Sequence, residues 1–182
     1  MTIRLFSIVW LIIFFGVFVF LSWSIFAPQN NWAYGQLPLA QEINPGLNSI
    51  FIPKIGLRTP IIFSQSEEEK EIEKDLFRGI VRWPGTAFPG ENKNITLVGH
   101  SSSYFWNRTS YSRIFANLDK LLPGDTISIF YNGKKFEYAV EKVEIVSSKS
   151  VKVLPNEPGL TLITCWPAGT TLKRLAVKAK TI

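Results

Sequence analysis

The sequence predicts an all-β domain that closes, or nearly closes, into a barrel. Many short runs rich in β-branched and aromatic residues are separated by Gly, Pro and Asn turn signals, a pattern typical of that architecture. The Asn132-Gly133 dipeptide joins two alternating runs, which is the strongest short-range signal for a β-hairpin. The sequence does not show the strand–helix–strand alternation of a parallel α/β fold.

A charge-free apolar segment precedes the predicted barrel. Residues 5–26 carry no charged side chain and would span about 33 Å as a helix, close to the hydrocarbon thickness of a bilayer. Because Arg4 lies just before this segment, the positive-inside tendency places residues 1–4 in the cytosol and the following chain outside the membrane. We therefore expect a single-pass transmembrane anchor. A cleaved signal peptide is the alternative, although its apolar region is usually shorter.

The remaining chain divides into a linker and one folded domain. Residues 27–48 combine prolines, glycines and amide side chains without hydrophobic periodicity, which predicts a linker. Residues 49–182 are expected to form the extracytoplasmic domain. Its predicted strands cover residues 50–55, 59–63, 94–98, 126–131, 134–146, 160–165 and 172–178.

Two short helices are predicted between the strands. Ser66 followed by the acidic residues 67–69 is typical of a helix start, and the helix is expected to run to about Phe77 with Ile72 on its buried face. A second helix is predicted over residues 114–122, where a Pro-Gly pair ends it. The acidic run lacks EF-hand spacing, so it is interpreted as a solvated helix face.

The chain is basic, with a net charge of +6 at pH 7. Such a surface favours an anionic membrane or anionic wall polymers as neighbours. No aromatic and basic motif for nucleic acid is present, and a position outside the membrane also argues against that partner.

The chain holds one cysteine, Cys165, and one histidine, His100, and each ends an apolar β-type run. A thiol beside an imidazole is the smallest set of groups that supplies a thiolate nucleophile near neutral pH. Arg174 follows on the returning strand, where its fixed positive charge would favour a thiolate and hold a developing oxyanion. Thr164, next to the cysteine, is expected to donate a hydrogen bond to the same substrate oxygen.

Other readings of these residues are weaker. A lone cysteine is often a buried, inert core residue, and a single cysteine cannot form an internal disulfide. One cysteine and one histidine are too few ligands for a zinc site, so we expect neither a metal nor another cofactor. A serine hydrolase built on Ser101, Ser102 or Ser103 is disfavoured because no Gly-x-Ser-x-Gly elbow occurs.

Several motifs together resemble the sortases, the cell-wall transpeptidases. The segments 96–100 (TLVGH) and 161–165 (TLITC), followed by Arg174, resemble the signature of that family. Residues 51–56 (FIPKIG) resemble its opening strand, and residues 83–90 (WPGTAFPG) resemble the turn before its histidine strand. The pieces occur in the family's order and cover roughly residues 50–180.

The resemblance implies a closed eight-stranded sortase-type barrel with one or two short helices. It implies His100, Cys165 and Arg174 as the catalytic set, with Thr164 and Arg174 also binding substrate. The implied reaction cleaves a C-terminal sorting motif similar to Leu-Pro-x-Thr-Gly on a secreted protein through a Cys165 thioester. The acyl group then passes to an amine of a cell-wall peptide or a pilin lysine, at the bacterial cell membrane.

Two departures leave the subclass open. The loop after the cysteine, residues 165–170, is short, unlike the long calcium-linked arrangement of some housekeeping sortases. The linker holds Asn31-Trp32 where pilin-polymerising sortases carry an Asp-Pro-aromatic lid motif. Two other functions stay open as alternatives: a cysteine protease that mainly hydrolyses, and a non-catalytic anchored β-barrel binding module.

Overall fold

The computed structural model describes residues 48–102, 109–148 and 157–182 of the chain. The predicted transmembrane anchor over residues 5–26 and residues 27–47 of the predicted linker lie outside the described part. Of the helices in these three ranges, none is long and apolar enough to cross a membrane.

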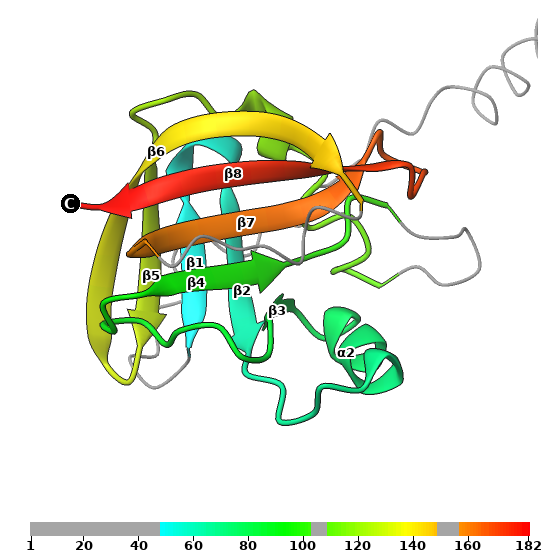
Figure 1. Ribbon diagram of the computed structural model, residues 1–182, viewed down its shortest axis with the longest axis horizontal. Coiled ribbons are helices and arrows are strands. Elements are labelled where there is room, and N and C mark those ends of the chain that lie inside the picture. Colours follow the sequence, from blue (N-terminus) through cyan, green and yellow to red (C-terminus); the bar gives the residue numbers. More distant parts are fainter. Residues whose placement is uncertain (1–47, 103–108, 149–156) are drawn as a thin grey trace, which may run out of the picture. The chain divides into compact units, whose positions relative to one another are not determined.

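The described residues form a closed barrel with the strand order β1-β2-β3-β4-β7-β8-β6-β5 (Figure 1). The predicted all-β barrel is thereby confirmed. Its strands are β1 (Ser49–Ile52), β2 (Leu57–Ile62), β3 (Ile80–Arg82), β4 (Asn94–Val98), β5 (Thr126–Tyr131), β6 (Lys134–Ser147), β7 (Gly159–Trp166) and β8 (Lys173–Thr181).

Two parallel contacts distinguish this barrel from an up-and-down meander. Strands β2 and β3 run parallel, as do β4 and β7, and every other neighbouring pair is antiparallel. The parallel pairing of β4 with β7 brings the carboxyl ends of both strands to the same end of the barrel. Figure 1 shows β4, β7 and β8 side by side on one wall.

The core is built from alternate residues of each strand. On β7, Leu160 and Leu162 are buried in the apolar cluster inside the barrel, and Leu97 on β4 joins them. Successive side chains of a strand point to opposite faces, so Ile163 and Cys165 lie on the outer face of β7. The strand alternation therefore fixes which side of the wall presents the thiol.

The Asn132-Gly133 hairpin is confirmed. Both residues have positive φ, 49° and 74°, as a two-residue hairpin turn of type I′ requires. The turn sets the register of β5 against β6, in which Tyr131 pairs with Lys134.

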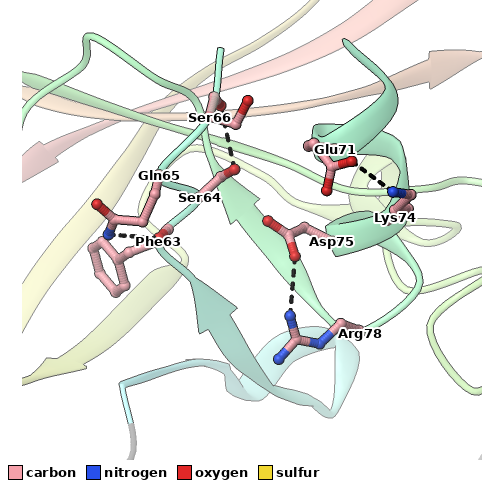
Figure 2. A network of polar contacts seen from close by, with 8 residues as sticks. All are labelled: Phe63, Ser64, Gln65, Ser66, Glu71, Lys74, Asp75 and Arg78. Atoms are coloured by element: carbon pink, nitrogen blue, oxygen red, sulfur yellow. Dashed lines mark hydrogen bonds and ion pairs between the residues drawn. The ribbon is translucent and has the colours of Figure 1, made fainter. Parts of the chain in front are cut away.

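Helix α2 (Glu69–Leu76) begins later than the sequence predicts. The Ser66 hydroxyl oxygen accepts a hydrogen bond from the Glu68 N–H at 3.0 Å, but the helix itself starts after Glu68. Ile72 is buried as expected. An ion pair between Arg78 and Asp75, 3.1 Å from Nη1 to Oδ1, joins the last turn of α2 to the residues that follow (Figure 2).

The second predicted helix, over residues 114–122, is wrong. Residues 110–117 form turns, followed by the 3-10 helix η2 (Leu118–Lys120). The N–H of Phe115 donates to the carbonyl oxygen of His100, 2.9 Å away, and so does not close an α-helical turn. Tertiary contact with the segment after β4 replaces the local bond here.

The structure differs from the sequence prediction at two strands, one of which is shorter than predicted and one of which was not predicted. The predicted run 50–55 is divided, because Pro53 ends β1 and opens the 3-10 helix η1 (Pro53–Ile55). Strand β3 was not predicted, since three residues are too few to show a period. It pairs with both β2 and β4 and is needed to close the barrel.

Candidate active site

The register of β4 against β7 brings His100 and Cys165 together. Val98 pairs with Ile163, and the Gly99 N–H continues the ladder by donating to the Ile163 carbonyl at 3.2 Å. His100 and Cys165 each lie two residues beyond that pair, Cys165 within β7 and His100 just after the end of β4. Neighbouring strands of a sheet are about 4.8 Å apart. Both residues are half-buried, and the parallel register brings them to the same end of the barrel.

Arg174 is the direct cross-strand neighbour of Cys165. The two residues pair in the antiparallel register of β7 and β8, so their side chains leave the same face of the sheet. The Arg174 guanidinium donates through Nη1 to the carbonyl oxygens of Thr171 and Lys173, each at 3.0 Å. These two bonds hold the guanidinium at the β7–β8 loop. Both of them use Nη1.

Thr164 makes a contact that the sequence did not predict. Its side chain lies on the opposite face from Cys165 and is 3% exposed. Its hydroxyl donates to the Gly99 carbonyl oxygen at 2.8 Å. Since a hydroxyl has one proton, this arrangement does not make the expected donation to a substrate oxygen. Thr164, which precedes Cys165, instead bonds to Gly99, which precedes His100.

We expect Thr164→Val to lower the free energy of unfolding by about 1–3 kcal/mol, because the buried Gly99 carbonyl would lose its donor. Turnover should also fall, since the backbone at Gly99, next to His100, loses its side-chain hydrogen bond to β7. Thr164→Ser keeps the hydroxyl and should retain most of the stability and most of the turnover. Denaturant unfolding and steady-state kinetics of the two variants check this. Equal stability of the valine and serine variants would contradict the assigned role.

An aromatic ring packs against the half-buried His100. The Phe77 ring lies 5.2 Å from the imidazole, centroid to centroid, with 39° between the planes. Burial lowers the pKa of His100, and the negative charge of Glu73 partly opposes that shift. Among the residues that the structure describes, none hydrogen-bonds the buried Nε2 of His100. The site therefore favours a neutral imidazole at neutral pH.

Gly99 allows the backbone just before His100 to pack closely against Phe115 and Ile114. A Cβ atom at this position would lie 2.7 Å from Cδ2 of Phe115 and 3.0 Å from Cγ2 of Ile114. The glycine of the TLVGH motif thus has a steric explanation. Phe77, Glu73 and Phe115 were not predicted as site residues. The sequence indicates only that Glu73 and Phe77 belong to one predicted helix.

The serine alternative gains no geometric support. Ser101 is 3% exposed, and Ser102 accepts a hydrogen bond from the Gly169 N–H at 2.7 Å, which joins the segment after His100 to the β7–β8 loop. Ser103 lies outside the described residues.

Comparison with known proteins decides the family. The model of the family described as Sortase domain matches residues 50–182. The chain belongs to the sortase family. It is 31% identical over 172 residues to Sortase SrtE1 of Streptomyces coelicolor, a match that covers 85% of this chain and 46% of that protein. It is 28% identical over 150 residues to Sortase A of Bacillus anthracis, covering 78% of this chain and 65% of the relative.

Solved sortase structures share the barrel. Sortase C1 of Streptococcus agalactiae has a TM-score of 0.62 at 28% identity, with 74% of this chain and 66% of that one covered. A lid mutant of Sortase A from Corynebacterium diphtheriae has the same TM-score and identity, with 75% and 69% covered. The chain spans less than two thirds of the length of the curated relatives that it matches. The resemblance inferred from the sequence motifs is confirmed.

Proposed function

We propose that this sortase is a cysteine transpeptidase in which Cys165 is the nucleophile, His100 the general acid and base, and Arg174 the group that holds the substrate oxyanion. Sortases are cysteine transpeptidases, which supports the class of reaction. One observation supports the assignment of residues: β4 and β7 are parallel and end at the same side of the barrel, where His100 follows β4, and Cys165 on β7 pairs with Arg174 on β8.

The first half-reaction forms a thioester. Neutral His100 takes the proton of the Cys165 thiol, and the thiolate attacks the carbonyl carbon of the scissile peptide bond. The carbonyl oxygen takes the negative charge beside Arg174. The C–N bond then breaks, and the His100 imidazolium gives its proton to the leaving amine. The products are an acyl-enzyme on Cys165, a free amine and a neutral imidazole.

The second half-reaction transfers the acyl group. A new amine attacks the thioester carbon, and neutral His100 accepts the proton that the amine loses. Collapse of the tetrahedral intermediate forms the new amide and releases the Cys165 thiolate. A neutral imidazole is the form that this step needs, and burial of His100 favours it.

The substrate and setting are part of the same proposal. The sorting motif is similar to Leu-Pro-x-Thr-Gly, with cleavage after Thr, and the acceptor is an amine of a cell-wall peptide or a pilin lysine. Residues 5–26 anchor the enzyme in the bacterial cell membrane with the catalytic domain outside. The charge-free sequence of that segment and the position of Arg4 support this placement.

Partition between transfer and hydrolysis tests the proposed function. The full chain in detergent is incubated with a panel of Leu-Pro-x-Thr-Gly-like peptides, with and without triglycine or a diamine. We expect the ligated product to increase with amine concentration at the expense of free acid, because both arise from one thioester. Free acid alone at every amine concentration would identify a hydrolytic protease instead.

A further inference from the structure

Helix α2 ends against the proposed catalytic histidine. Phe77 follows the last residue of α2, and its ring contacts the His100 imidazole at 5.2 Å between centroids. Glu73 lies four residues before Phe77. Residues at that spacing share a helix face, so Glu73 is on the side of α2 that approaches the imidazole. The end of α2 therefore sets an aromatic ring against the imidazole and carries an exposed carboxylate on the same helix face.

The end of α2 is held firmly in place. The Phe77 N–H donates to the Lys74 carbonyl at 3.2 Å, and Arg78 pairs with Asp75 (Figure 2). Gly79 lies so close to β2 that a Cβ there would be 2.7 Å from the Pro60 carbonyl oxygen. Phe77 thus sits between a helix end and a close backbone contact, which restricts where its ring can lie.

We propose that α2 positions the histidine: Phe77 holds the imidazole plane and excludes water from it, and Glu73 stabilises the imidazolium that forms during turnover. The inference deepens the proposed function, because it rests on His100 as the acid and base of that reaction. Phe77 and Glu73 act through His100 and are positioning residues. The effects proposed for Phe77 and Glu73 on the imidazolium have opposite signs, which keeps both protonation states of the imidazole accessible.

Among the residues that the structure describes, the sheet brings two more such groups to the end of the barrel where His100 follows β4. They are Cys165 on β7 and its cross-strand neighbour Arg174 on β8. From α2, Glu73 is the group whose charge acts on the imidazole. Burial is the larger influence, and it lowers the pKa of His100.

The single histidine permits a direct test. Because His100 is the one histidine in the chain, the Cε1–H signal of the full protein in detergent micelles, made without a histidine tag, reports its titration alone. We expect Phe77→Ala to raise the pKa of His100, since water then reaches the ring, and Glu73→Gln to lower it, since the stabilising charge is lost. High salt should weaken the Glu73 effect and leave the Phe77 effect in place.

Matched variants separate positioning from general damage. Glu71→Gln makes the same charge change on the other face of α2 and should leave the titration unchanged. Phe77→Tyr keeps the ring and should retain kcat/KM within about threefold, whereas Phe77→Ala should lose about tenfold to hundredfold.

The titration needs no turnover, so its result stands apart from the transpeptidase assignment. Opposite shifts from Phe77→Ala and Glu73→Gln in an inactive protein would keep α2 as the histidine's support while refuting the proposed function. Unchanged titration in both variants, or shifts of the same sign, would overturn the inference. If Phe77→Ala does not fold, Phe77→Leu takes its place beside the Glu73→Gln titration.

Discussion

Cys165→Ala is expected to abolish both cleavage and transfer of a sorting peptide, a loss of about 10⁴-fold or more in kcat. The thiolate is the atom that bonds to the acyl group, and the chain contains no second cysteine to replace it. Steady-state kinetics with a cleavable reporter peptide measure the loss. The fold should survive, because Cys165 is half-buried on the outer face of β7 and lies outside the apolar core cluster.

Two controls make this result specific. Cys165→Ser keeps nearly the same volume and should be almost as inactive, since a hydroxyl is a much weaker nucleophile than a thiolate at neutral pH. Thermal unfolding of both variants should match the parent protein. Turnover retained by Cys165→Ala would remove the thiol from the mechanism and favour a structural cysteine.

Arg174→Ala is expected to reduce kcat/KM by about 10²–10³-fold. Arg174 is the cross-strand neighbour of Cys165 on the same face of the sheet, and loss of one preorganised oxyanion donor has an effect of that size. Arg174→Lys keeps the charge but not the planar fork, so we expect an intermediate rate. Peptide kinetics at a fixed pH check the order of the three proteins.

Lys173→Ala is the matched control for this prediction. It removes a positive charge from the neighbouring residue, which is exposed and has its side chain on the other face of β8. Its kcat/KM should stay close to that of the parent protein. An equal loss in the Lys173 and Arg174 variants would mean that net positive charge at the rim, rather than a placed donor, supports the reaction.

The reactive residues could be found from the sequence because their types are rare and their positions regular. One cysteine and one histidine leave a single pairing, and both end apolar runs that form the parallel strands β7 and β4. The hairpin at Asn132-Gly133 could also be predicted from the sequence, because a turn with two positive φ angles favours Asn followed by Gly. These features depend on local chemistry, which a sequence displays directly.

Features that depend on tertiary contact could not be predicted in the same way. The turns at residues 110–117 exist because the Phe115 N–H bonds to His100, which lies fifteen residues earlier in the chain. The role of Thr164 depends on the Gly99 carbonyl of another strand. The contact of Phe77 with His100 likewise joins a helix end to a distant strand end. The local hydrophobic periodicity of the sequence gives no signal for any of these long-range contacts.

Capture of the acyl-enzyme tests the central claim most directly. The full chain in detergent is mixed with a Leu-Pro-x-Thr-Gly-like peptide in the absence of amine, quenched in acid and analysed by intact mass and peptide mapping. We predict a mass increase equal to the peptide's acyl fragment, located on Cys165 and removed by a later pulse of triglycine. An unmodified Cys165 in protein that still cleaves the peptide would contradict the account.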